Sequence, residues 1–487
     1  MKFWISTIFA FFTIISITTN AQTRNVVIGS LEQDSIEKAN FYNKNFHSEI
    51  KTYTEETNNQ NIYGLQKNGF QVLPIENLSL GYQSNGENKT LYNTFLGISP
   101  SYSFKQKLTV SASVLCGLTS NLLHRQQLAD SLDFFPQLGY FKKNDNNYFV
   151  KYFEFYINYR PVDFLLLSLG KGKKQVGEGL RPAIISSSNS GMYYFDLRVD
   201  MKNVCYVFSV NGAKNLDTKL KTNKTKWTVY HLVSWNIAKW LSIGGYEAVC
   251  LVRRDSVNNS KFVDLHYLNP LIFSRPIEYS LGSPDNEILG VFGKLKFYQQ
   301  TLYAQAMIDE FKIKEVKSSN GWWANKYSLQ CGAKGFVKDF SYNLEFNYIR
   351  PYMYSHDDAN NSYSMFSQPI ANPYGANLKE ALCQIKYYKN RISACLTIDY
   401  IEQGKDFGDK YSYGGNILRS YNSRKQEYNN SVGQGLNTKF TNISLLVSYN
   451  PEFLKNFSVY LQGGKFDNNK FVSIGIKTAL IPFDTTF

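Results

Sequence analysis

The feature that most constrains this chain is a repeated two-residue alternation of apolar and small polar side chains. Near the C-terminus, for example, Val472 and Ile474 alternate with Ser473. Successive side chains of a strand point to opposite faces, so each such segment is expected to be a strand with one apolar and one small, polar face. We predict about eighteen of them, at residues 72–84, 93–105, 108–120, 148–160, 163–173, 190–201, 204–214, 225–238, 241–254, 286–298, 301–313, 326–338, 340–353, 380–388, 391–404, 439–449, 455–466 and 470–483.

Short and long connections alternate between these segments. The short ones are at 105–107, 160–163, 200–203, 238–240, 298–301, 338–339 and 388–391. The long ones are at 121–147, 174–189, 215–224, 255–285, 314–325, 354–379 and 405–438. In an antiparallel barrel every second connection lies at the same end, and outer-membrane barrels have short periplasmic turns and long extracellular loops. The sequence therefore predicts an all-β fold, a closed antiparallel outer-membrane β-barrel of about 18 strands formed by residues 72–487.

The two ends of the chain agree with an exported barrel. Residues 1–21 combine Lys2, an apolar stretch from Phe3 to Ile17 and a small-residue cleavage pattern, which is typical of a signal peptide. This apolar stretch is shorter than a membrane-spanning helix needs. The chain ends at Phe487, an aromatic terminus of the kind expected after a last barrel strand. We expect an integral protein of the Gram-negative outer membrane.

Residues 22–71 are polar and lack the two-residue alternation. We interpret them as a short, partly helical extension on the periplasmic side of the first strand. The alternative that we considered is a plug inside the barrel.

Composition and motif spacing argue against catalytic and metal chemistry. The six cysteines form no CxxC pair and the five histidines form no HxH or HExxH motif, so we expect no metal and no cofactor. His231 and Ser234 are three apart on one strand and therefore point to opposite faces. The run GKGKKQVGEG at 170–179 lacks the GK[ST] ending of a phosphate-binding loop. We expect neither an enzyme nor a nucleic-acid-binding protein.

The segment YLNPLIFSRPIEYSLGSPDNEILG at 267–290 is too apolar for a solvated loop and too rich in proline for a strand. A barrel of sixteen to eighteen strands is wide enough for an aqueous channel, unless loops fill it. We therefore predict that 267–290 and FSQPIANPYGAN at 366–377 fold into the lumen and plug or constrict the barrel. The alternative is an open channel for small solutes.

Basic and aromatic side chains suggest what the loops bind. The formal net charge is +14, or +13 once Lys2 is removed with the signal peptide. Clusters of Lys and Arg in the loops predict attraction to anionic sugars or to lipid phosphates. Equally, they could face lipopolysaccharide without specific binding. The pair Trp322 and Trp323 is suited to stacking on sugar rings, whereas a membrane-interface position is the alternative.

Several stretches together resemble one family. They include FLLLSLGKGKKQVGEGLRPAIISSS, YLNPLIFSRPIEYSLGSPDNEILG, QPIANPYGAN and YGGNILRSYNSR, and they follow one another in the right order over most of residues 45–450. They resemble the Wzi-like capsule-assembly outer-membrane proteins, most closely the branch of gliding Bacteroidetes labelled RemB. Glu178 and Leu180, with Pro182 following, stand where the family usually has an aspartate and an aromatic residue.

The resemblance implies a barrel plugged by its own loops that holds exported polysaccharide, with a contribution to gliding motility. Its partners would be outer-membrane lipid, lipopolysaccharide and a surface polysaccharide. A scaffold for secretion or motility machinery is a further alternative. The candidate polysaccharide-binding residues are chosen as basic and aromatic residues of the loops and are not carried over from the family: Lys171, Lys173, Lys174, Arg181, Arg275, Trp322, Trp323, Arg419 and Arg424.

Overall fold

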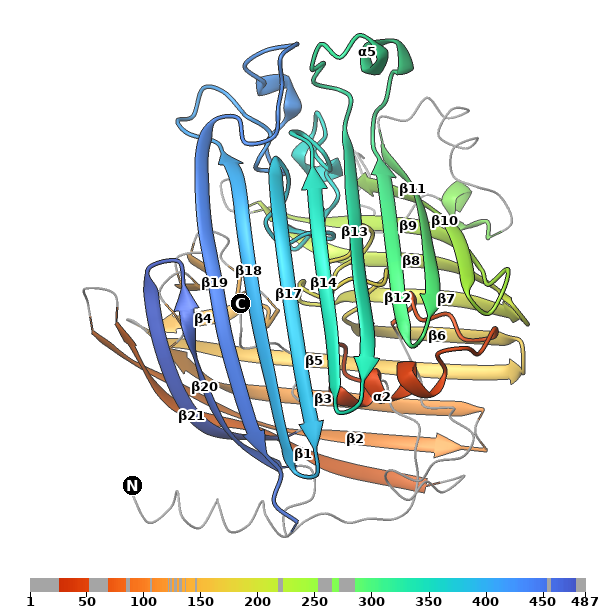
Figure 1. Ribbon diagram of the computed structural model, residues 1–487, viewed down its shortest axis with the longest axis vertical. Coiled ribbons are helices and arrows are strands. Elements are labelled where there is room, and N and C mark those ends of the chain that lie inside the picture. Colours follow the sequence, from red (N-terminus) through yellow and green to blue (C-terminus); the bar gives the residue numbers. More distant parts are fainter. Residues whose placement is uncertain are drawn as a thin grey trace.

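Eighteen antiparallel strands close into a barrel in the computed structural model (Figure 1). Each strand pairs with its neighbour in the chain, and the ring closes where β1 pairs with β21, from Asn77 opposite Lys477 to Ser84 opposite Lys470. The structure describes residues 26–51, 69–84, 88–105, 107–120, 122, 125–126, 129–130, 134–135, 137–144, 147–217, 222–252, 265–270, 285–452 and 457–478. The predicted signal peptide (residues 1–21), Arg275 and Phe487 lie outside these residues.

The strand bounds agree closely with the alternation in the sequence. The barrel strands are β1 Gly69–Ser84, β2 Lys89–Phe104, β3 Leu108–Ser120, β5 Asn147–Val162, β6 Leu165–Gly172, β7 Met192–Met201, β8 Val204–Asp217, β9 Thr222–Trp235, β10 Leu241–Val252, β11 Asn286–Phe297, β12 Gln300–Ile308, β13 Tyr327–Val337, β14 Phe340–Ile349, β17 Leu378–Lys389, β18 Ile392–Lys405, β19 Leu436–Tyr449, β20 Phe457–Phe466 and β21 Asn469–Thr478. Every predicted strand overlaps one of these. The fold-class prediction is confirmed.

Short helices and strands lie in the N-terminal segment and in the connections between the barrel strands. They are α2 Leu31–Ala39, β4 Phe141–Asn144, the 3-10 helix η1 Leu265–Leu268, α5 Ile313–Lys317, η2 Ala359–Asn361, the hairpin β15 Ser364–Met365 with β16 Gln368–Pro369, and η3 Tyr421–Ser423. Among the described residues, no helix is both long and apolar enough to cross a membrane. The predicted long connection 215–224 is instead mostly strand, because β8 and β9 continue to Asp217 and from Thr222.

The outer face of the barrel is apolar and is bordered at one end by a band of aromatic side chains. We call the end that carries the tight turns the short-turn end, and the opposite end the long-loop end. Leu80, Ile98, Val291 and Ile474 are exposed in the middle of outward faces. Exposed aromatic side chains gather at the short-turn end, at Tyr102, Phe104, Phe164, Trp235, Trp240, Phe297, Tyr298, Phe340, Tyr388 and Tyr449. An apolar belt with an aromatic girdle is the surface that barrels present to lipid.

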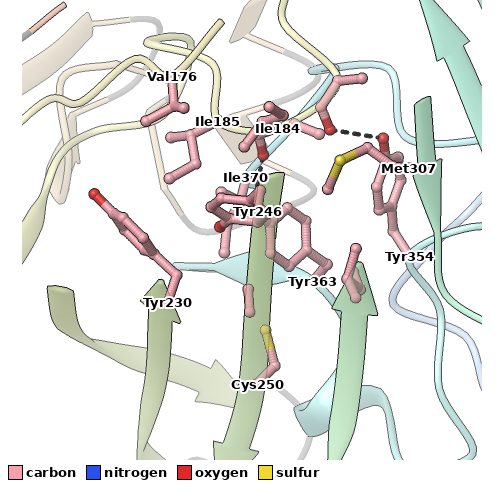
Figure 2. Close-up of a cluster of buried hydrophobic side chains, with 14 of the residues drawn as sticks. Val176, Ile184, Ile185, Tyr230, Tyr246, Cys250, Met307, Tyr354, Tyr363 and Ile370 are labelled. Atoms are coloured by element: carbon pink, nitrogen blue, oxygen red, sulfur yellow. Dashed lines mark hydrogen bonds between the residues drawn. The ribbon is translucent and has the colours of Figure 1, made fainter. Parts of the chain in front are cut away.

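Two long loops fold into the lumen and bury an apolar cluster there (Figure 2). Ile184 and Ile185, from the loop between β6 and β7, pack against Tyr363 and Ile370, from the loop between β14 and β17. The hydroxyl of Tyr363 donates to the Ile184 carbonyl at 2.8 Å. The predicted inward folding of residues 366–377 agrees with this cluster, which includes Phe366, Ile370, Ala371 and Ala376.

A third long-loop segment, between β3 and β5, also lies inside. Phe135 and Leu138 pack with Phe95 and Tyr148 on the inward faces of β2 and β5. Phe134 stacks on Phe366 with the ring centroids 5.1 Å apart, and so joins this segment to the first two loops. Side chains from three loops therefore occupy the long-loop half of the lumen.

The predicted inward folding of the segment 267–290 is wrong for residues 267–270. Tyr267 packs on the outward-facing side chains Phe208, Val229 and Val249 of β8, β9 and β10. The Tyr206 hydroxyl, also outward, donates to the Pro270 carbonyl at 2.5 Å. The apolar residues of this segment do need burial, but the outer wall provides it as well as the lumen does.

The described part of the N-terminal segment, residues 26–51, lies against the inner wall rather than apart from the barrel. Figure 1 shows α2 within the ring of strands at the short-turn end. Asn236 donates to the Lys44 carbonyl at 2.7 Å, and Lys386 contacts Asp34 at 3.0 Å. This placement corresponds to the plug that we considered as the alternative, not to a separate extension. The physical reason is charge, since wall lysines provide partners for the carboxylates of this segment.

Candidate functional site

The loop between β6 and β7 reaches the opposite wall because glycine allows a close approach. Gly177 has φ +125°, and a Cβ there would lie 2.5 Å from the side-chain nitrogen of Gln305. At Gly179 a Cβ would overlap the carboxylate of Glu345. The backbone N–H of Leu180 instead donates to that carboxylate at 2.6 Å. The glycine run therefore docks the loop on β12 and β14 and does not cradle a phosphate.

Two predicted sugar-binding cations, Lys174 and Arg181, are buried inside the barrel. Lys174 Nζ contacts Asp196 at 2.5 Å and donates to Asn211 at 2.9 Å. Arg181 pairs with Glu380 and, at 2.8 Å, with Asp399. Both side chains therefore hold the loop to the wall.

A small cavity lies beside Lys174. Its volume is about 30 Å³, and it is lined in part by Tyr194, Arg198, Tyr230 and Ile50. A single water requires at least about 10–15 Å³ of such space. The cavity therefore has room for a water or two and not for a sugar ring.

Glu178 joins the inward loop, the wall and the N-terminal segment. Its carboxylate accepts hydrogen bonds from Ser48 at 2.5 Å and from Lys294 at 2.7 Å, and it pairs with Lys334. Lys51 lies 3.7 Å from it. Glu37 and Glu49 complete the network, because Glu37 contacts Lys51 and Lys334 and Glu49 contacts Lys294.

The lysines of this network lower the pKa of its carboxyl groups Glu37 and Glu178. Burial acts to raise the pKa of Glu37, but Lys334 and Lys51 outweigh it and lower that pKa to about 2. Burial likewise opposes ionisation of Glu178, and Lys294, Lys334 and Lys51 still hold its pKa well below the ordinary value. Both carboxyl groups are therefore ionised at neutral pH.

Three residues at the edge of the network have the types of a catalytic triad. Ser234 Oγ lies 2.7 Å from His47 Nδ1, and Glu49 contacts both residues. In a serine hydrolase the carboxylate and the serine bond to different ring nitrogens, whereas here both contact Nδ1. His47 and Glu49 have side chains 0% and 1% exposed, so a substrate has no access to them. We interpret this group as part of the buried contacts that hold the N-terminal segment to the inner wall.

A second group of predicted residues meets at the long-loop end. Trp323 packs on Tyr421 with ring centroids 4.7 Å apart, and the Arg424 guanidinium lies 4.2 Å from the Trp323 ring. Trp322 lies beside Trp323, with the Lys312 ammonium 5.4 Å from its ring. We call these five residues the aromatic cluster.

Arg350 fixes the two loops that carry this cluster. Its guanidinium donates to the carbonyls of Trp322, Asn325 and Asn430. The backbone N–H of Trp323 donates to the Glu427 carbonyl at 2.9 Å. The cluster is therefore held by backbone contacts that do not depend on its own side chains.

The remaining predicted residues do not join the cluster. Arg419 donates to the carbonyls of Gly408 and Asp409 within its own loop. Lys171 faces outward over the Tyr193 ring, and Lys173 contacts Gln137 at 3.5 Å.

Sequence reasoning missed exposed aromatic residues on the loop between β18 and β19. Phe407 is 53% exposed and stacks on Tyr413, with ring centroids 4.7 Å apart. Tyr411 and Tyr428 are exposed on the same loop. The signal was the aromatic content of DFGDKYSYGGN, a segment without strand alternation.

Comparison with solved structures finds the same architecture elsewhere. The structure of Wzi, described as an outer-membrane protein involved in group 1 capsule assembly in Escherichia coli and as a carbohydrate-binding β-barrel, matches with a TM-score of 0.51 and 11% identity, over 86% of this chain and 85% of that one. Pseudomonas aeruginosa OccK8 (OprE) matches with a TM-score of 0.46 and 9% identity, over 84% and 97%. Acinetobacter baumannii OccAB4 matches with a TM-score of 0.44 and 10% identity, over 85% and 97%. No protein-family model and no curated protein matches the sequence.

Replacing Glu178 by Gln should loosen the N-terminal segment. The change removes one of the two carboxylates that Lys51, Lys294 and Lys334 each contact, and loss of a buried ionic partner typically costs about 3–5 kcal/mol. We expect faster proteolysis and faster hydrogen exchange of residues 26–51, with the barrel intact. Asp467→Asn, at an exposed hairpin tip, is the control and should change neither rate. Equal protection in both variants would contradict the role given to Glu178.

Acid should release the same segment over a defined pH range. Glu37 has a folded-state pKa of about 2 against an ordinary value of 4.5, so its stabilising contribution is complete above about 4.5 and is lost as the pH falls towards 2. The protection of residues 31–39 against hydrogen exchange, taken relative to the intrinsic rate at each pH, should be high at pH 7 and at pH 5 and should fall between pH 4 and pH 2. The barrel strands serve as the internal control. Unchanged protection down to pH 2 would show that the lysines do not hold Glu37.

Proposed function

We propose that this chain is an integral outer-membrane protein that holds a surface polysaccharide at its long-loop end, without catalysing a reaction. In this proposal the signal peptide directs export, the short turns lie in the periplasm and the long loops face outward. The observation that carries it is the aromatic cluster. Aromatic faces beside the cations of Arg424 and Lys312 suit a sugar ring that bears an anionic substituent.

The plugged lumen supports retention rather than passage. Three loops occupy the long-loop half, and residues 26–51 are held at the short-turn end by ion pairs with Lys294, Lys334 and Lys386. The Wzi structure, which has the same architecture, is described as a carbohydrate-binding barrel, and this also favours polysaccharide binding. A contribution to capsule assembly and to gliding motility, with secretion or motility machinery as partner, is the finer form of the proposal.

The polysaccharide proposal is tested by removing the half-buried side chains of the aromatic cluster. Trp322→Ala and Arg424→Ala should each weaken binding of the cell's own surface polysaccharide by about tenfold, or about 1.4 kcal/mol. Affinity of purified protein in detergent and release of polysaccharide from cells are the two measurements. Phe340→Ala, which removes an exposed girdle aromatic at the other end, is the control. Full retention by both variants would defeat the proposal. A deletion strain scored for attachment and for spreading tests the motility part.

The channel alternative is tested by conductance. With the lumen filled by loops and by the N-terminal segment, the purified protein should give no large, stable openings in a planar bilayer. Glu178→Gln should increase the frequency of small openings, because it loosens that segment. Large openings of the unmodified protein would favour a solute channel over polysaccharide retention.

A further inference from the structure

Four lysines line the inner wall at the short-turn end. Lys294 and Lys296 lie on β11, Lys334 on β13 and Lys386 on β17. Lys294 and Lys296 are 4% and 7% exposed. We call these four residues the lysine wall. Buried ammonium groups are costly unless an anion or a carbonyl compensates them, so the partners of this wall matter.

Among the described residues, the carboxylates that contact the lysine wall come from segments other than the barrel strands. Glu49 contacts Lys294, Glu37 contacts Lys334, and Asp34 contacts Lys386 at 3.0 Å. Lys296 donates to the carbonyl of Phe41 at 2.9 Å. Residues 26–51 supply all of these groups. The remaining carboxylate is that of Glu178, from the inward loop.

The N-terminal segment adds little apolar packing to these contacts. In residues 26–51 the buried apolar side chains are those of Val26, Phe41 and Ile50. The helix α2, with sequence LEQDSIEKA, has Gln33 and Glu37 as its buried residues. A permanent plug gains more from apolar burial, since a buried ion network is often no more stabilising than a hydrophobic replacement. The contacts of this segment are those of an anionic ligand that occupies a cationic site.

The spacing of the lysine wall indicates the size of that ligand. In the barrel the order is β11, β12, β13, β14, β17, so the lysines lie on every second strand. Neighbouring strands are about 4.8 Å apart, which separates successive lysine positions by about 10 Å across the wall. A single small anion cannot reach all of them. A polymer with repeated carboxylates can.

We propose that the lysine wall is a second, periplasm-facing binding site for an acidic polysaccharide such as a polyuronate, and that residues 26–51 occupy it as an internal acidic competitor. The polymer enters from the short-turn end and exchanges its carboxylates for those of Asp34, Glu37 and Glu49. This inference builds on the proposed function and adds the substrate class and a site on the opposite side of the membrane. Glu178 then transmits occupancy to the inward loop, because it shares Lys294 and Lys334 with the competitor.

The test uses the full-length protein in detergent, with alginate oligomers as the polyuronate and dextran of equal length as the neutral glycan. The background carries Trp322→Ala and Arg424→Ala, so that the aromatic cluster does not contribute. In this background Glu37→Gln with Glu49→Gln weakens the competitor and should tighten alginate binding at least tenfold. Adding Lys334→Gln should abolish the gain. Asp409→Asn with Asp467→Asn removes the same charge at exposed sites and should produce no gain.

Two further measurements complete the design. Alginate should accelerate hydrogen exchange of residues 31–39, and its binding should weaken as salt is raised, because charge drives the contact. If the double glutamine variant does not form a barrel that resists unfolding in dodecyl sulfate gels, Asp34→Asn alone should give a smaller gain of the same sign. The proposal is overturned if alginate binds no more tightly than dextran, or if the gain survives Lys334→Gln. Since the aromatic cluster is absent throughout, neither outcome depends on the polysaccharide proposal at the long-loop end.

Discussion

The structure depends on closure of the sheet by backbone hydrogen bonds. In lipid an unpaired strand edge has no water to satisfy it, so the first and last strands must meet. They do so where β1 pairs with β21. Closure at eighteen strands sets the width, and at this width inward side chains alone do not fill the interior. Whatever fills it must come from loops or from the chain ends.

The lumen is occupied by apolar contacts in one half and by ion pairs in the other, and the two halves stabilise different segments. At the long-loop end Ile184, Tyr363 and Ile370 pack as in a soluble core. At the short-turn end Glu178 is surrounded by Lys51, Lys294 and Lys334. Apolar packing fixes the loops that fill the long-loop half of the lumen. Ion pairs hold the N-terminal segment, and ion pairs can be exchanged for those of another anion without unfolding the barrel.

Much of the fold was predictable, and the candidate site was less so. The predicted strands all overlap observed ones, because the alternation of side chains is a local property. Trp322, Trp323 and Arg424, predicted separately, do meet at the long-loop end. Lys174 and Arg181 are residues of the types expected in a basic surface patch, but each forms an ion pair with a carboxylate inside the barrel. The sequence has no local sign that distinguishes these two outcomes.

The sequence by itself determined the number of strands, their alternating faces and the end at which the long loops lie, since each follows from spacing along the chain. The tertiary structure decided on which side of the wall each loop packs. Residues 267–270 and 366–377 are similarly apolar, but the first lies outside the barrel and the second inside it. The difference depends on partners distant in the chain, such as Phe208 for Tyr267 and Ile184 for Tyr363. Only closure of the barrel brings such partners together, so no local pattern encodes them.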